Sequence, residues 1–305
     1  MTVSYCITLY NKEIYVTETL RAVLAEYRQT GGEIIVYDDC STDSSLRLVN
    51  AFATHAPVRV IAGEPNIGVV LATDRLIREA NAPYLKLVDA DDVLRPGSTV
   101  YLRDALDSLA ADMIYGKTVS QAEAALWPTT HDAAAEIFLV PGAFRVFLRL
   151  IEFNVSSTLS RTSAAKATLP LPSNVRLAQD LILGLRLARH GRIAATNRLI
   201  AVAPDTSVGR LSRQVARMYA DFCRIIDGEL ALGASATDAT SAARRNARRC
   251  LRYFRRYAPG SLRSYERFWL ISQAVAPPWQ SIEASRRTLR RIDTLYQRDV
   301  GRVLG

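Results

Sequence analysis

The chain has 305 residues, of which 49% are hydrophobic, and a formal net charge of +9 at pH 7. This length and apolar content suit one large domain, alone or with an appendage, and exclude an intrinsically disordered protein. No apolar run approaches the roughly 20 residues that span a bilayer, and a strand pattern begins at Val3, so we expect neither a transmembrane helix nor a signal peptide. The four cysteines lack C-x-x-C spacing, which indicates free thiols in the cytoplasm rather than a disulfide framework or a zinc site.

Charge is distributed unevenly along the chain. Residues 1–120 contain 11 basic and 16 acidic residues, whereas residues 121–305 contain 28 basic and 14 acidic ones. From residue 210 onward there are 19 basic and 8 acidic residues, and every basic one is arginine. The first part therefore suits an acidic site, and the last part presents a basic surface to an anionic partner.

The first 120 residues alternate between strand-like and helix-like segments. Strands are expected at 3–9, 33–37, 58–61, 84–88 and 113–115, and helices at 14–28, 44–54, 69–80 and 96–109. This alternation predicts an α/β fold, with a mostly parallel sheet and helices on both faces. Ligands of such sheets bind at the carboxyl ends of the strands. The polar clusters at 8–13, 38–43 and 89–92 all follow such ends, so we expect them to converge on one crevice.

The rest of the chain changes character near residues 207–211, where we expect a domain boundary. Before it, the pattern predicts a helix at 142–153, a strand at 155–159 and a helix at 177–190. After it, the pattern is almost entirely helical. The clearest helix is 242–258, which carries seven arginines beside one apolar stripe made of Ala243, Ala247, Cys250, Leu251, Phe254 and Tyr257.

The strand expected at 84–88 ends in three carboxylates, those of Asp89, Asp91 and Asp92. Such a cluster repels itself unless a divalent cation or a hydrogen-bond network holds it. At the end of a buried strand in an α/β domain it indicates a site for a metal and a diphosphate, and thus an enzyme. The alternative is that Asp91 and Asp92 only cap the following helix, as aspartate often does.

Five segments in order resemble the family 2 glycosyltransferases of the GT-A fold. They lie at 4–13, 36–43, 66–68, 89–92 and 179–180, with Cys40 where the family usually has glycine. A lone D-x-D occurs by chance in many proteins, but five pieces in the correct order are specific. The resemblance covers residues 2–205. It implies a GT-A domain over 1–207, with a nucleotide-binding half at 1–120 and an acceptor half at 121–207, followed by an Arg-rich helical extension at 208–305.

The resemblance implies a donor site made of Thr8, Tyr10, Asn11, Glu13, Asp38, Asp39, Asn66, Gly68, Lys86, Asp89 and Ala90. Thr8 and Tyr10 would pack around a pyrimidine, and Asp39 would accept its ring N–H. Asp89 would lie near the ribose. Ordinary packing for Tyr10 and an Asx turn for Asp39 remain the alternatives. The Arg-Asn pair frequent in the family is replaced by Thr73-Asp74, so either one diphosphate contact is missing here or it comes from Arg75 or Lys86.

For the metal, Mn²⁺ or Mg²⁺, the resemblance implies Asp91 as a ligand. Many relatives also have a histidine near the metal, after the helix that follows the catalytic base (here 181–190), and Asp205 is the candidate substitute in this chain. The role of Asp92 stays open. Asp180 is the candidate general base, which would remove the acceptor's hydroxyl proton, with an N-cap as the alternative. The family usually has glutamate where this chain has Gln179.

The expected activity is metal-dependent, inverting transfer of a sugar from a nucleotide-diphosphate donor, with a UDP-sugar favoured. The acceptor would be a glycan or lipid-linked glycan of a surface polysaccharide. The alternative is a catalytically silent protein that binds sugar nucleotides or acts as a scaffold. For the 208–305 extension three roles remain: a solvated face of packed helices, attachment to the anionic inner face of the cytoplasmic membrane, and nucleic-acid binding, which no motif supports. The same helices are also candidates for self-association.

Overall fold

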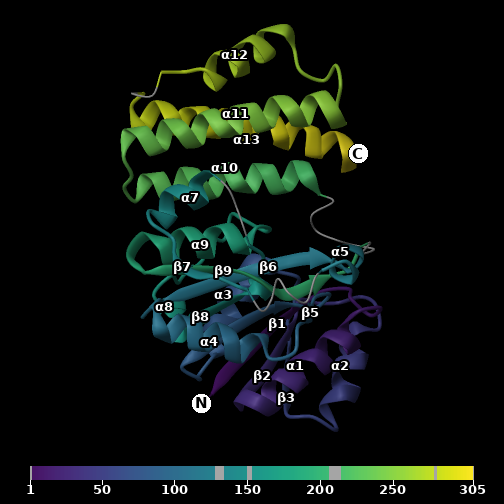
Figure 1. The fold of residues 1–305 in the computed structure, drawn as a ribbon. Coiled ribbons are helices and arrows are strands. Elements are labelled where there is room, and N and C mark those ends of the chain that lie inside the picture. The colour runs from purple at the N-terminus through teal and green to yellow at the C-terminus, as the bar shows by residue number, and fades with distance from the viewer. Residues whose placement is uncertain (1, 128–133, 150–152, 206–213, 278–279, 305) are drawn as a thin grey trace. The chain divides into compact units, whose positions relative to one another are not determined.

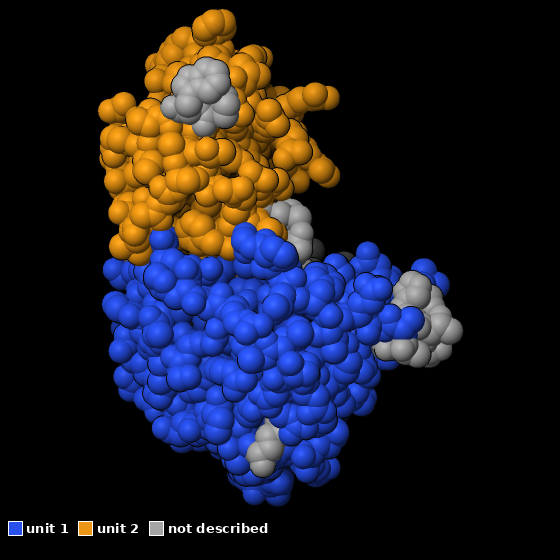
Figure 2. Space-filling model, turned by 60° about the vertical axis from the view of Figure 1, so that its left-hand side comes forward, with its two compact units in different colours: residues 1–143, 152–173, 186–209 blue, residues 144–151, 174–185, 210–305 orange. Residues whose placement is uncertain are grey.

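The computed structural model describes residues 2–127, 134–149, 153–205, 214–277 and 280–304. The chain divides into two compact units, which Figure 2 colours separately. The first unit contains residues 1–143, 152–173 and 186–209, and the second contains residues 144–151, 174–185 and 210–305. Two segments that precede the predicted boundary at residue 207, residues 144–151 and 174–185, thus belong to the same unit as the C-terminal helices. The division into a GT-A domain and a helical extension at that residue stays a prediction.

The first unit is built on one mixed sheet (Figure 1). In the described residues it has nine strands, in the order β3-β2-β1-β4-β8-β6-β9-β5, with β7 beside β9. The strands are β1 Val3–Leu9, β2 Gly32–Asp38, β3 Val58–Ala62, β4 Tyr84–Asp89, β5 Val93–Leu94, β6 Met113–Ser120, β7 Ile137–Leu139, β8 Thr158–Arg161 and β9 Ile193–Ala203. The pairs among β3, β2, β1 and β4 are parallel, whereas β8 runs antiparallel to both β4 and β6.

Helices cover both faces of the parallel part, as the strand–helix alternation predicted. α1 Val16–Thr30 and α3 Val69–Glu79 pack against β1 and β2, and α2 Ser45–Ala53 packs against β3. The other helices of this unit are α4 Ser98–Ser108, α5 Gln121–Ala125 and α8 Thr162–Lys166. On β1, Tyr5 and Ile7 belong to one buried cluster with Leu20 of α1. Cys6 points to the other face, where its thiol lies 3.7 Å from the carbonyl oxygen of Leu76 in α3. Side chains of consecutive residues of β1 lie on opposite faces of the sheet because a strand has a two-residue period. The predicted α/β fold class is confirmed.

A buried carboxylate joins two of these helices. Glu26 of α1 accepts the backbone N–H of Gly97 at 2.6 Å and that of Thr99 at 2.7 Å, at the start of α4. These donors have no partner within α4, because a helix leaves its first N–H groups free. Glu26 thereby caps α4 from a neighbouring helix and fixes the segment that follows the aspartate cluster.

The second unit is helical, with α7 Ala143–Arg149, α10 Val215–Ala231, α11 Ala236–Tyr257, α12 Ser264–Ala274 and α13 Ile282–Leu304. Helix α9, Gln179–His190, contributes its first residues to this unit and its last ones to the first unit. Tyr296 of α13 is buried and stacks on Phe254 of α11 with ring centroids 5.9 Å apart. Among the helices that the structure describes, none is both long and apolar enough to cross a membrane.

Three sequence predictions need correction in detail. Residues Val155–Ser157 form a 3₁₀ turn, and the strand expected from residue 155 begins only at Thr158. In the stripe of α11, Ala243, Ala247, Cys250 and Phe254 are buried, but Tyr257 at the helix end is exposed. The helix expected at 142–153 is α7, Ala143–Arg149, and residues 150–152 lie outside the described part.

Candidate active site

The carboxyl ends of β1, β2 and β4 bring three of the predicted clusters together. In the parallel register Leu9 of β1 faces Asp38 of β2, and Thr8 faces Asp89 of β4. The hydroxyl of Thr8 donates to Oδ1 of Asp89 at 3.2 Å. The expected convergence of these clusters on one edge of the sheet is therefore observed.

The loops after β1 and β2 are held together by side chains. Thr42 N–H donates to Oδ1 of Asn11 at 2.8 Å, and Ser44 N–H donates to Oε2 of Glu13 at 2.9 Å. In return, the backbone N–H of Glu13 donates to Asp43 at 3.2 Å. Asn11 and Cys40 both have positive φ, at 50° and 62°, so each loop turns sharply. Asn11 and Glu13 thus connect the loop after β1 to the loop after β2.

Asp39 is buried and organises the turn before α3. Its Oδ1 accepts the N–H of Ile67 at 2.7 Å and its Oδ2 accepts that of Gly68 at 2.8 Å. The side-chain amide of Asn66 donates to the backbone oxygen of Asp39 at 2.8 Å. The predicted donor residues Asp39, Asn66 and Gly68 therefore form one hydrogen-bonded unit. The Asx-turn alternative was a bond between Asp39 and Ser41, and the structure shows Ser41 N–H donating to Oδ2 of Asp38 at 3.0 Å.

Asp38 has an unsatisfied atom. Its Oδ2 takes the N–H of Ser41, whereas its buried Oδ1 has no hydrogen-bond partner in the structure. An unpaired buried carboxylate oxygen is costly, and such atoms frequently mark a place where a ligand or water binds.

The three carboxylates after β4 point to three different partners. Asp89 pairs with Thr8, and Asp92 accepts the side-chain amide of Asn154 at 2.8 Å. Oδ2 of Asp91 forms an ion pair with Nζ of Lys12 at 2.6 Å. This separate pairing resolves the mutual repulsion that the sequence implied. Lys12 was not among the predicted site residues, although its position within the 8–13 polar cluster was a signal for it.

Three further donor-site candidates have distinct environments. Tyr10 directly follows β1 and is 40% exposed, and a stacking contact of its ring with a base stays a prediction. Ala90 is buried, and its N–H donates to the backbone oxygen of Thr8 at 3.2 Å. Lys86 is fully buried, and its ammonium donates to the carbonyl oxygens of Ser156 and Thr158 at 2.7 and 3.0 Å. A donor contact by Lys86 stays a prediction, and the side chain has no exposed surface with which to make one.

The Thr73-Asp74 pair that replaces the family's Arg-Asn pair has a structural role. Asp74 accepts the N–H of Leu171 at 2.7 Å and pairs with Arg78 one turn later at 2.6 Å. Arg75, the other candidate for the diphosphate, lies 3.5 Å from Glu79. Both positions of the pair are buried, so Asp74 anchors the 170–171 loop to α3.

The candidate base Asp180 lies in the first turn of α9, within the second unit. Its Oδ1 accepts the N–H of the next residue, Leu181, at 2.8 Å. Burial raises the pKa of Asp180 from its ordinary 3.8 to about 6, against the opposing effect of the backbone hydrogen bonds. A carboxylate with such a pKa is largely ionised near pH 7 and basic enough to take a proton.

Asp205, the candidate second metal ligand, is exposed and accepts the N–H of Ala122 at 3.0 Å, at the start of α5. Within the described ranges, no three His, Cys, Asp or Glu side chains come together as a metal cage. The aspartate cluster still fits Mn²⁺ or Mg²⁺, because Mg²⁺ is usually held by one or two carboxylates and by substrate phosphates. Asp91 already binds a cationic group, the Lys12 ammonium, and has the chemistry for this role.

A family model and several curated proteins match parts of the chain. A family model described as glycosyl transferase family 2 matches residues 4–157. The chain is 30% identical over 96 residues to poly(ribitol-phosphate) beta-N-acetylglucosaminyltransferase TarS of Staphylococcus aureus, covering 31% of this chain and 17% of TarS. It is 30% identical over 115 residues to glycosyltransferase GlyG of Streptococcus pneumoniae, covering 37% and 38%. An uncharacterized protein of Mycobacterium tuberculosis is 34% identical over 85 residues, and the match spans only 25% of that relative.

Solved structures resemble nearly the whole chain. S. aureus TarS 1–349 in complex with UDP-GlcNAc aligns with a TM-score of 0.65 at 18% identity, covering 98% of this chain and 92% of that one. A mannosyltransferase from Pyrobaculum calidifontis in complex with GDP-Man and Mn²⁺ aligns with a TM-score of 0.60 at 15% identity, covering 97% and 85%. Because the family model matches just over half of the chain and the fold agrees with these structures, the protein belongs to glycosyl transferase family 2 and has the GT-A fold.

Proposed function

We propose that this protein transfers a sugar from a nucleotide-diphosphate donor to a hydroxyl group of a glycan or lipid-linked acceptor, with inversion at the anomeric carbon. The observation that carries the proposal is the meeting of Thr8, Asp39 and the 89–92 cluster at the carboxyl ends of β1, β2 and β4. In α/β sheets this edge is where ligands bind.

A UDP-sugar is the favoured donor. The carboxylate of Asp39, oriented by two backbone N–H groups at the carboxyl end of β2, would accept the imide N–H of uracil. The exposed ring of Tyr10 would stack on the base, and the orphaned Oδ1 of Asp38 would accept a further donor group of the nucleoside. UDP-GlcNAc is bound by TarS, whose fold this chain shares.

In the proposed reaction Asp180 takes the proton of the acceptor hydroxyl while that oxygen attacks the anomeric carbon. The bond from that carbon to the diphosphate oxygen breaks, and the diphosphate leaves with the electron pair. Bound Mn²⁺ or Mg²⁺ would neutralise the charge on the leaving diphosphate, with Asp91 as its protein ligand. Lys12, released from Asp91, would add a second positive charge at the same phosphates.

A thermal-shift screen tests the donor site directly. UDP, UDP-GlcNAc, UDP-glucose and GDP-mannose are each added with and without Mn²⁺, and a bound donor raises the melting temperature with concentration. We expect shifts from the uridine nucleotides that grow with Mn²⁺ and disappear in Asp39→Asn. A GDP-mannose shift without a UDP shift would contradict the uracil assignment.

An assay of UDP release distinguishes sugar transfer from the alternative of a catalytically silent protein that only binds sugar nucleotides. With an acceptor present, Asp91→Ala and Asp180→Asn should each abolish release, whereas Asp104→Asn, an exposed change on α4, should not. If a donor that binds is never turned over by the wild-type protein, the silent sugar-nucleotide-binding alternative holds instead. Membrane attachment and self-association through 208–305 stay predictions.

A further inference from the structure

Four arginines of the second unit lie close together. Arg149 comes from α7, and Arg245, Arg249 and Arg252 recur on one face of α11, at intervals of four and three residues. Arg149 donates to the hydroxyl of Ser241, one helical turn before Arg245, at 3.2 Å, which places α7 beside this face of α11. Burial, followed by repulsion from Arg249, Arg252 and Arg149, lowers the pKa of Arg245. Burial also lowers the pKa of Arg249, with Arg252 adding to the effect.

Among the residues that the structure describes, these four arginines have no acidic partner of the kind that neighbouring arginines have. Arg145 pairs with Asp238 at 2.6 Å, and Arg224 pairs with Asp221 at 3.2 Å. By contrast, within the described part of the chain the cluster's own polar contacts are to neutral atoms. Arg149 donates to Ser241 at 3.2 Å, and Arg249 donates to Asn246 at 3.2 Å.

One guanidinium atom of the cluster has no partner at all. The Nε–H of Arg245 is buried and makes no hydrogen bond in the structure. A buried donor without an acceptor is costly, and inside a cluster of like charges the missing acceptor is best supplied by an anion.

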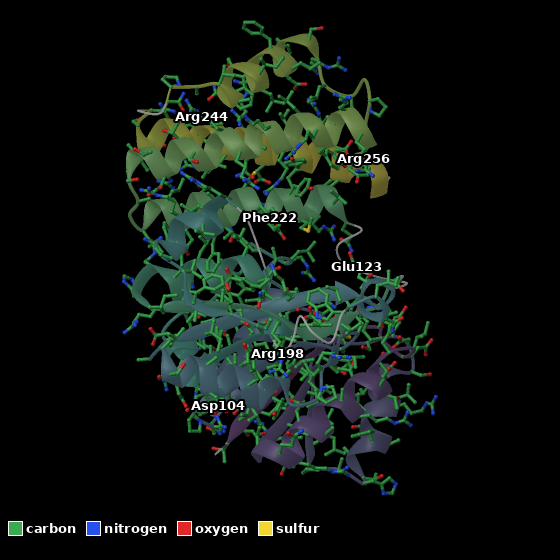
Figure 3. All side chains as sticks on the ribbon, in the orientation of Figure 1. Asp104, Glu123, Arg198, Phe222, Arg244 and Arg256 are labelled. Carbon is green, nitrogen blue, oxygen red and sulfur yellow. The ribbon has the colours of Figure 1, made fainter. Side chains whose placement is uncertain are left out.

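Aromatic rings of α10 form the floor beneath the cluster. The guanidinium carbon of Arg249 lies 4.9 Å from the ring centre of Phe222 and 5.2 Å from that of Tyr219. Figure 3 labels Phe222 on α10, and Arg244 and Arg256 towards the two ends of α11, the helix that carries three of the four arginines. These ring contacts orient Arg249, and the edge N–H groups that do not donate to Asn246 would face a ligand.

Exposure within the cluster is graded. Arg149 and Arg252 are exposed, whereas Arg245 and Arg249 are half-buried. A flat membrane-facing patch would present exposed side chains alone. A half-buried base with an exposed rim suits a compact anion that enters between the arginines.

We propose that Arg149, Arg245, Arg249 and Arg252 form a binding site for a diphosphate group, separate in the chain from every donor-site residue. Several guanidinium groups around one anion match the chemistry of phosphate oxygens, which accept bidentate hydrogen bonds from arginine. The site does not depend on the proposed sugar transfer, since it involves no residue of the donor or acceptor chemistry assigned above.

Inorganic pyrophosphate is the probe, titrated calorimetrically into the full chain in metal-free buffer of constant ionic strength. The paired variant Arg245→Gln/Arg249→Gln should weaken pyrophosphate binding tenfold or more. The matched control Arg255→Gln/Arg267→Gln removes the same charge from exposed positions of α11 and α12, and should change binding less than twofold. Equal weakening by both pairs would overturn the site, because it would show attraction to net charge alone.

Two further arms keep the test decisive. Since Arg249 is stacked on two rings, its loss could disturb folding, which the melting temperature reports. The exposed pair Arg149→Gln/Arg252→Gln then replaces it and should also weaken pyrophosphate binding. Vesicles of phosphatidylglycerol and of phosphatidylcholine form the second arm. The proposal would be overturned in favour of a membrane-binding surface by two results together. The wild-type protein would sediment with the anionic vesicles while Arg245→Gln/Arg249→Gln would not, and the wild-type protein would not bind pyrophosphate.

Discussion

The ammonium nitrogen of Lys12 lies 2.6 Å from Oδ2 of Asp91, and about a tenth of each side chain is exposed. A divalent cation at Asp91 must compete with this ammonium, because both bind the same carboxylate. Lys12 and the cation would then be separated by repulsion, and the donor diphosphate is the natural new partner for Lys12. Under the proposed function, the Lys12–Asp91 pair would couple metal binding to nucleotide binding.

Lys12→Met should therefore strengthen Mn²⁺ binding in the absence of nucleotide and weaken UDP binding by about tenfold, the loss of one charge-assisted contact. Titration of Mn²⁺ followed by electron paramagnetic resonance gives the first value, and calorimetry with UDP gives the second. Lys117→Met, at an exposed position of β6, is the control. Unchanged Mn²⁺ affinity in Lys12→Met would show that the ion pair does not compete with the metal.

Asp39→Asn should destabilise the turn before α3. An asparagine keeps one acceptor for the N–H groups of Ile67 and Gly68, but its amide nitrogen cannot accept the other. One buried N–H is left unpaired, at a cost of about 1–3 kcal/mol in the free energy of unfolding. Urea denaturation measures this loss, with Asp104→Asn as the exposed control. A variant as stable as the wild type would mean that the turn does not depend on this carboxylate.

Asp180→Asn should lower kcat by a factor of about 10² to 10⁴, the usual contribution of a general base. In the wild-type protein kcat should fall as pH decreases below about 6, since burial raises the pKa of Asp180 to that value and only its ionised form accepts a proton. Steady-state kinetics between pH 5 and 8 test both statements. A wild-type profile that stays flat down to pH 5 would remove Asp180 from this role.

The same variant has a predicted effect on stability. Asp180 binds a proton more tightly when folded than when unfolded, so its ionisation opposes folding as pH rises from about 4 to 6. Asp180→Asn should thus unfold at a higher temperature than the wild type at pH 8, and this advantage should vanish at pH 4. Thermal denaturation at the two pH values checks the sign independently of any activity.

Lys86 supplies a test with the opposite sign. Burial lowers its pKa to about 7, despite the attraction of Glu26 and Asp92, so between pH 7 and 10 the unfolded chain holds a proton that the folded one lacks. Stability from this group should rise with pH over that window, by at most ~1.4 kcal/mol per pH unit. The difference in unfolding free energy between the wild type and Lys86→Met isolates it. No change in this difference between pH 7 and 9 would contradict the buried, neutral amine.

The local pattern was sufficient for much of the first unit. The strand ending at Asp89 and the turn at Asn66–Gly68 could be predicted because hydrophobic periodicity and turn chemistry act over a few residues. The local sequence pattern was less informative where contacts between distant residues determine the backbone conformation. The 155–157 segment has strand-like residues, but its backbone turns so that Ser156 and Thr158 can accept hydrogen bonds from Lys86, which lies about 70 residues earlier in sequence.

By itself, the sequence determined which chemical groups follow the ends of β1, β2 and β4 and the order in which they occur, because parallel strands place their carboxyl ends together. Only the tertiary structure decided what each group binds. It paired Asp91 with Lys12, turned Asp39 to the Ile67 and Gly68 amides, and joined Arg149 of α7 to Ser241 of α11. These partners lie far apart in the chain and meet only through tertiary packing, so their contacts cannot be predicted from the spacing of residues in the sequence.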